Sequence, residues 1–260
     1  MKNKLVKVLK ITLIAAFWIG VWYFIFGVIN EPNLFPAPHN VVLRLFALLK
    51  TTAFYITVFQ SIIRIFIGLI IGIVLGIALA IPTARWKMAH DFLSPVMTVV
   101  KVTPVASFIF LLLLWIGRDI LPAVISICVV LPVVWTSIET GIKETDNSLI
   151  QMARAYKMNF WQKIRFIYLP ATLPYFISAV RSSVGIAWKA GIAAEVLTAP
   201  LIAIGKQIAE SRNNIEPTDL FTWTLVAIII SVVIEKIIII IFERIAKSSK
   251  VFKERGAVFD

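Results

Sequence analysis

Charged side chains that interrupt long apolar runs are the residues of this sequence that could do chemistry. A charge at membrane depth is costly in lipid, so it must face protein or a water-filled path, and a functional role is the default interpretation. Glu235 and Lys236 stand near the end of the last apolar run, where static ion pairing or snorkelling explains them better. The others are Arg64, Lys101, Arg181, Lys189 and Glu195.

Two of these apolar runs hold more cations than anions. They contain Lys101, Arg181 and Lys189, but only Glu195 among the acids. If these side chains and Pro104 line one translocation path, its potential is positive and favours an anion. The alternative is structural pairing with other helices or across a dimer, because Lys189 and Glu195 lie too far apart around one helix to pair directly.

The groups that most enzymes use are scattered or missing. His39 and His90 fall on opposite sides of the membrane in the topology given below, so they cannot form a His pair or a His-centred triad. Cys128 is the single cysteine and is interpreted as a small buried hydrophobic residue. The sequence has no G-x-x-x-x-G-K-[ST] phosphate loop. We therefore expect a non-enzymatic chain without metal or cofactor, and any ATP hydrolysis in a separate polypeptide.

The composition is typical of a polytopic membrane protein. Of the 260 residues, 60% are hydrophobic and the mean hydropathy is +0.91, which is too apolar for a soluble domain with one core. Apolar runs of bilayer-spanning length predict an all-α fold with six transmembrane helices. The runs lie at about 11–29, 57–82, 92–116, 119–138, 175–198 and 219–242.

The net charge of +12 indicates membrane orientation rather than a nucleic-acid partner, because Lys and Arg are retained on the cytoplasmic side. Six spans put both termini on one side of the membrane, and most of the basic residues outside the spans lie on that same side. We expect a multi-pass protein of a bacterial cell membrane with both termini cytoplasmic. Residues 1–56 should form a helix, an external loop and a short surface helix. Residues 57–244 should form a five-helix core with a coupling loop at 139–174, and 245–260 a basic tail.

Glycines and prolines give these spans their predicted packing. Gly68, Gly72 and Gly76 recur at four-residue spacing, which predicts a ridge that another helix approaches closely. Prolines in the next two spans, including Pro104 and Pro132, either kink the helices around a path or only shape their packing.

The longest polar stretch, residues 147–174, predicts two short helices. Ser148 with Gln151, and Asn159 with Gln162, have the spacing of capping boxes, so each pair marks a helix start. A break is expected between them, near residues 157 and 158.

The second of these helices should lay an apolar face on the membrane domain. Phe160, Ile164 and Ile167 have the helical spacing for such a face. The helix should stop before Pro170, because a proline there cannot donate the backbone hydrogen bond of a helix interior.

This stretch resembles the cytoplasmic EAA loop of bacterial ABC importer permeases, which reads Glu-Ala-Ala, three residues, Gly, nine residues, Ile-x-Leu-Pro. Here Gln151, Met152 and Ala153, then Lys157, then residues 167–170 keep that spacing. Gln can replace Glu in a capping box. Lysine in place of glycine matters more, because the positive φ of such a turn is unfavourable for lysine, so the turn should differ in shape or shift.

Other parts of the chain are similar to the nitrate, sulfonate, taurine and bicarbonate group of these permeases. The similar runs are residues 61–64 followed by the three glycines, 101–104 leading to 114–117, and 185–188 leading to 193–195. The resemblance implies a homodimeric permease of an importer for a small solute, an anion by the charge argument above. It also implies two cytoplasmic ATPase subunits that bind ATP and Mg, an external substrate-binding protein and surrounding membrane lipid. By the same resemblance, the residues that contact the ATPase are Gln151, Met152, Ala153, Arg154, Tyr156 and Lys157.

Three alternatives stay open from the sequence. The same type of importer could carry a vitamin precursor or another neutral or cationic solute. A stand-alone channel or secondary carrier would need no ATPase. A membrane enzyme is disfavoured by the absent catalytic groups.

Overall fold

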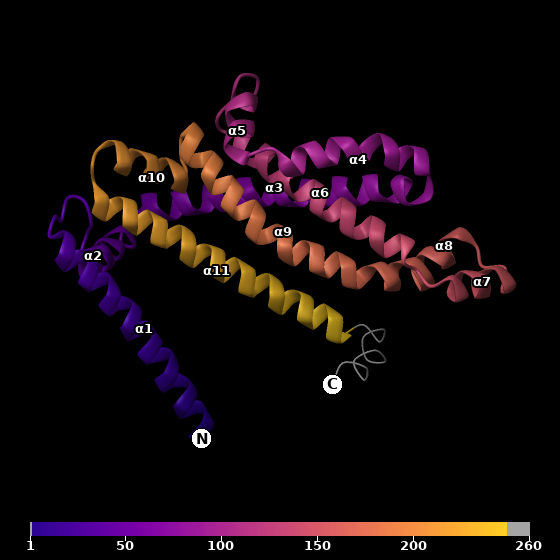
Figure 1. Cartoon of the computed structure of the whole chain (residues 1–260), viewed down its shortest axis with the longest axis horizontal. Helices are drawn as coiled ribbons and strands as arrows, with labels where there is room; N and C mark the ends of the chain where they lie inside the picture. Colours follow the sequence, from indigo (N-terminus) through magenta and orange to yellow (C-terminus); the bar gives the residue numbers. More distant parts are fainter. Residues whose placement is uncertain (1, 249–260) are drawn as a thin grey trace.

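Long helices packed side by side form the centre of the molecule. The computed structural model describes residues 2–248, and every regular element among them is a helix. α6 (Leu121–Lys143) packs against both α3 (Thr52–Arg85) and α9 (Leu169–Thr198). Figure 1 shows these helices and α11 (Pro217–Ser248) running along the long axis of the molecule. Their facing sides form the main apolar core.

Glycines on α3 allow α6 to approach its backbone. A Cβ added at Gly68 would lie 2.3 Å from the carbonyl oxygen of Ala123. A Cβ at Gly72 or Gly76 would lie 2.9 or 2.8 Å from the Cβ of a valine on α6. Any larger side chain at these positions would push the helices apart, so the close packing on which membrane helices depend is set here by the missing side chains.

The helix expected at residues 92–116 is broken in two. α4 (Lys87–Val102) and α5 (Val105–Leu113) are bent by 103° relative to one another. Pro104 explains the break, because a proline disfavours helical backbone at the preceding residue, and Thr103 has a ψ of 127°. Of the two alternatives for its prolines, this span therefore shows the kink, and α5 projects away from the line of α4 (Figure 1).

An all-α polytopic membrane fold is confirmed, but the count of six spans is not. Among the described residues, four helices are long and apolar enough to cross a membrane, and the bent pair would make five. α9 has 30 residues, or about 45 Å of helix, but charged side chains interrupt its apolar residues. It is therefore not one of these four helices. The four spans are Thr12–Ile29, Thr52–Arg85, Leu121–Lys143 and Pro217–Ile238.

α1 (Lys2–Ile29) stands apart from the bundle (Figure 1). None of its residues from 12 to 29 is buried. Its C-terminal end is held by Trp22, whose Nε1 donates to the carbonyl of Pro36 at 3.2 Å and whose indole contacts the ring of Phe221. α1 is thus attached to the rest of the chain at one end only.

The boundaries of the other elements differ from the expected ones in detail. The short surface helix is α2 (Pro38–Leu48), and α3 begins at Thr52, before the expected start of the core at 57. α6 continues to Lys143, and α9 begins at Leu169, so the connection between them is shorter than residues 139–174. Most of the predicted basic tail, from residue 249 on, lies outside the described residues.

Candidate functional site

α9 joins two polar sites that lie at opposite ends of the molecule. Figure 1 shows α7 (Asn147–Ala155) and α8 (Phe160–Lys163) at one end and α10 (Ile204–Asn213) at the other. We call α7, α8 and the turn between them the hairpin. We call the buried polar contacts around Glu195, at the α10 end, the outer cluster.

The hairpin forms the two short helices expected from the sequence, although one of its caps differs. Asn159 and Gln162 exchange two hydrogen bonds of 2.9 Å, so the predicted capping box is confirmed. The capping box predicted for Ser148 is not formed. α7 is capped by Asp146 instead, whose Oδ1 accepts from the N–H of Ser148 at 2.8 Å. An aspartate at the N-cap fills the same role, so the helix still starts close to the expected residue.

A lysine occupies the left-handed position of the turn between the two helices. Lys157 has a φ of 51°. Its N–H donates to the carbonyl of Arg154 at 3.0 Å, and the N–H of Met158 donates to Ala153 at 2.9 Å. These two bonds define a Schellman motif, in which glycine is the usual residue at the left-handed position. The expectation that this turn would differ in shape or shift is therefore wrong: the left-handed position stays at Lys157, which adopts the strained backbone itself.

The hairpin presents most of the expected ATPase-contacting residues to solvent. Ala153 alone is buried, at 1% exposure, and anchors α7. Tyr156 is 75% exposed and Met152 41%. The remaining residues of the set, all exposed, are Gln151, Arg154 and Lys157.

The expected apolar face of the second helix is only partly present. Ile167 is buried, but Phe160 is 70% exposed, so the prediction that Phe160 packs on the membrane domain is wrong. The cause is a change of helix type: residues Ile164–Tyr168 form a π-helical turn, η1, which alters the spacing that a single face requires. Trp161, which the sequence analysis did not single out, is exposed beside Phe160.

The second helix also does not stop before Pro170. η1 continues directly into α9, and Pro170 falls in the first turn of that helix. Pro170 therefore lies inside a continuous helical stretch, where it has no N–H to donate to the preceding turn.

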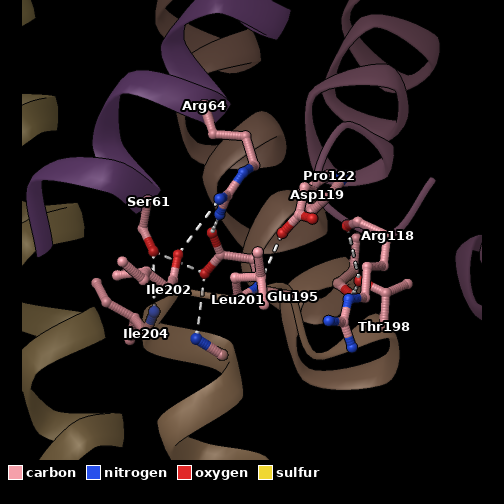
Figure 2. Close-up of polar contacts among 12 residues, drawn as sticks. Ser61, Arg64, Arg118, Asp119, Pro122, Glu195, Thr198, Leu201, Ile202 and Ile204 are labelled. Atoms are coloured by element: carbon pink, nitrogen blue, oxygen red, sulfur yellow. Dashed lines mark hydrogen bonds and ion pairs between the residues drawn. The ribbon is translucent and has the colours of Figure 1, made fainter. Parts of the chain in front are cut away.

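Glu195 is the centre of the outer cluster (Figure 2). Its carboxylate is fully buried and accepts from the hydroxyl of Ser61 at 2.8 Å, from Nη1 of Arg64 at 2.8 Å and from the N–H of Gly205 at 3.1 Å. Ser61 in turn accepts from the N–H of Ile204 at 2.9 Å. The cluster thus ties α3 and the start of α10 to the C-terminal end of α9.

A second acid holds the loop that follows α9. Asp119 Oδ1 accepts from the N–H of Leu201 at 2.8 Å (Figure 2). The loop starts at Ala199, which has a left-handed φ of 43°. Held by Asp119 at one point and by Glu195 at another, the loop places α10 against α3 and α9.

The residues predicted to line a path do not gather around Glu195. Lys101, Pro104, Arg181 and Lys189 are all exposed. Lys101 donates to the hydroxyl of Thr136 at 2.7 Å, whereas Arg181 and Lys189 have no hydrogen bond or ion pair with any described residue. Lys189 does not pair with Glu195 within the chain.

Sequence reasoning missed the partners of two buried acids. The partner of Glu195 is Arg64, which lies 131 positions away, and no local pattern connects them. At the other end of the molecule, Glu139 is buried and contacts His90 Nδ1 at 2.7 Å and Lys143 Nζ at 2.9 Å. The Glu139–Lys143 spacing is the usual one for a helical ion pair and was available as a signal.

Comparison with known proteins places this fold in a family. Residues 68–251 match the family model described as the binding-protein-dependent transport system inner membrane component. The chain belongs to this family. It is therefore the permease subunit of an ABC importer, and the all-α fold and the resemblance noted in the sequence are confirmed.

Related permeases differ in the substrates that their names give. The chain is 24% identical to the putative aliphatic sulfonates transport permease SsuC of Bacillus subtilis, over 84% of this chain and 79% of that protein. It is 32% identical to the bicarbonate transport permease CmpB of Synechococcus elongatus, over 32% of this chain and 29% of that protein. It is 26% identical to the riboflavin transport permease RibX of Chloroflexus aurantiacus, over 50% of this chain and 47% of that protein.

A solved structure supports the fold of the permease. A chain of the MetNI methionine ABC transporter in an inward-facing conformation matches with a TM-score of 0.55 and 18% identity. The match covers 73% of this chain and 90% of that chain.

Proposed function

We propose that this permease carries a small anion, such as a sulfonate, bicarbonate or nitrate, along a path lined by one face of α9. The observation that carries the proposal is that Arg181 and Lys189 lie exposed on α9 without an acidic partner among the described residues. A charged face on a membrane helix is unfavourable in lipid, so it faces water or a second protein surface. Relatives named for sulfonate, bicarbonate and nitrate transport support an anionic substrate.

The permease acts as a homodimer in this proposal. The exposed face of α9 also carries Ser178, Ser182 and Ala193, and a Cβ added at Gly185 would meet nothing within 4 Å. Two copies related by a two-fold axis would bring this face together with itself. The path between them would hold two sets of cations, whose potential attracts an anion.

The hairpin is the element that two cytoplasmic ATPase subunits contact. It lies at the opposite end of α9 from α10, so with the hairpin in the cytoplasm α10 faces the external binding protein. Both chain termini are then cytoplasmic in a bacterial cell membrane. The ATPases bind ATP and Mg, and their closure moves the hairpin and opens the path alternately to each side. Gln151, Met152, Arg154, Tyr156 and Lys157 form the contact, with Ala153 as the buried support.

Uptake by the reconstituted complex tests the substrate class. Proteoliposomes containing the permease, its ATPases and its binding protein should accumulate a labelled sulfonate, bicarbonate or nitrate when ATP is supplied. Lys189→Ala should reduce uptake about tenfold without reducing assembly, because one charge facing a desolvated anion contributes a kilocalorie or more. Lys50→Ala, at an exposed position after α2, is the matched control and should have no effect.

A second candidate substrate is a vitamin or another neutral solute. The match to a riboflavin transport permease favours it. In that case riboflavin uptake would be supported, none of the three anions would be accumulated, and Lys189→Ala would transport normally. This result would contradict the anion proposal and leave the exposed cations as structural charges.

A further inference from the structure

The hairpin is connected to α9 by continuous helix rather than by a loop. α8, η1 and α9 follow one another without interruption from Phe160 to Thr198, so a movement of the hairpin is passed directly to α9. η1 differs from its neighbours because the N–H of Leu169 donates to the carbonyl of Ile164, five residues back. Such a turn contains one residue more than an α-helical turn; it is rare, and it frequently lies at functional sites.

Pro170 provides the physical reason for this extra residue. In an α-helix, the ring of a proline clashes with the carbonyl four residues earlier, which here belongs to Phe166, and the proline has no N–H to donate. A wider turn immediately before Pro170 moves that carbonyl away from the ring. The π-helical form of η1 is therefore the form that this proline favours.

The base of α9 is fixed to α6 directly after η1. A Cβ added at Gly141 would lie 2.9 Å from the ring of Tyr175 and 3.2 Å from Cα of Thr172, so the two helices touch there. The hydroxyl of Tyr175 also donates to the carboxylate of Glu144, next to the end of α6. The C-terminal end of η1 is thus anchored to the membrane domain through α9, and its N-terminal end carries the exposed hairpin.

We propose that Pro170 is a positioning residue for coupling: it keeps η1 π-helical, and η1 sets the direction in which the hairpin leaves the fixed base of α9. This inference rests on the proposed role of the hairpin. Each residue of an α-helix turns the chain by about 100°. Conversion of η1 to α-helix would therefore swing the hairpin around the axis by roughly that angle, while every side chain on the hairpin stays unchanged.

Two linked changes in the assembled transporter test the proposal. Pro170→Ala restores the N–H and removes the ring, so η1 can become α-helical. Substrate carried per ATP hydrolysed should then fall about tenfold, as expected when a docking contact is lost. Deletion of the exposed Phe166 in the same chain removes the extra residue and should restore this ratio to within about twofold, because the α-helix then returns the hairpin to its original direction. Pro174→Ala, which lies outside η1, is the control and should change little.

The direction of the hairpin provides a second readout. Spin labels at Ala155 on α7 and Lys87 on α4, with Cys128 replaced, should report a changed distance in Pro170→Ala and the original distance after the deletion. Unchanged coupling and distance in Pro170→Ala would overturn the inference. If Pro170→Ala does not assemble, the variant with the deletion must still assemble and couple, and its failure would overturn the inference equally.

A cross-link separates this inference from the proposed function on which it rests. A cysteine at Tyr156 should cross-link to the ATPase in the otherwise unchanged complex. Absence of the cross-link would overturn the role of the hairpin and this inference with it. A normal cross-link together with a silent Pro170→Ala would overturn the role of Pro170 alone.

Discussion

Glu195→Ala should lower the free energy of unfolding by about 3–5 kcal/mol, because removal of one partner from a buried ion pair leaves the other partner uncompensated. The carboxylate is fully buried and accepts hydrogen bonds from Ser61, Arg64 and Gly205. After its removal, the Arg64 side chain, which is 13% exposed, keeps only a 3.3 Å bond to the carbonyl of Ile202. The expected loss follows from this unpaired charge more than from the lost contacts themselves.

The Arg44–Asp219 pair is a control matched in chemistry but not in burial. Its two contacts are both 2.6 Å, shorter than those of Glu195. The two side chains are however 44% and 18% exposed, so water screens the pair, and its bidentate geometry places it near the upper end of the roughly 0.2–1 kcal/mol that solvent-accessible ion pairs contribute. Asp219→Asn should therefore lower the free energy of unfolding by less than about 1 kcal/mol, which makes burial rather than distance the deciding quantity.

The assay is unfolding of the purified permease by SDS in mixed micelles, followed by circular dichroism. Arg64→Leu combined with Glu195→Leu should be less destabilising than the sum of the two single changes by about 2 kcal/mol, because no unpaired charge is left. The reasoning is refuted if Glu195→Ala is no more destabilising than Asp219→Asn, or if the two leucine changes are additive.

Three further predictions concern the packing, the hairpin and the topology. Gly68→Ala should lower the free energy of unfolding by about 1–3 kcal/mol, because the added methyl group overpacks against α6. Gly20→Ala is the control and should have no such effect, because nothing lies within 4 Å of its added Cβ. Equal melting temperatures for the two variants would contradict the packing argument. Lys157→Gly should relieve about 1 kcal/mol of left-handed backbone strain, so hydrogen exchange of the Met158 amide should slow roughly fivefold. Lys157→Ala keeps the strain and should leave this exchange rate unchanged. Equal exchange rates in the two variants would show that no strain is stored there. A cysteine at Asn213 should react with an impermeant thiol reagent from outside and one at Asn159 should not, once Cys128 is replaced; labelling at Asn159 would reverse the orientation.

Local patterns predicted the features of this permease that depend on near neighbours in the sequence. The capping box at Asn159 involves residues three apart, and the glycine spacing on α3 repeats every turn, so both are visible in a short window. The all-α membrane fold follows in the same way from runs of apolar residues.

Features that depend on distant or competing interactions could not be predicted in this way. The Glu195–Arg64 pair joins two helices that only the folded bundle brings together. The bend before Pro104 and the π-helical turn before Pro170 are two responses to the same residue type. One proline breaks its helix and the other follows a wider helical turn. The spacing of residues in the sequence does not predict which of the two responses occurs.

The lone attachment of α1 also affects how this sequence can change during evolution. None of the residues of this helix from 12 to 29 is buried, and the contacts of Trp22 and Tyr23 near its C-terminal end hold it to the rest of the chain. Substitutions at its exposed positions before Trp22 therefore disturb no buried contact in the same chain, and this part of the helix can drift in sequence.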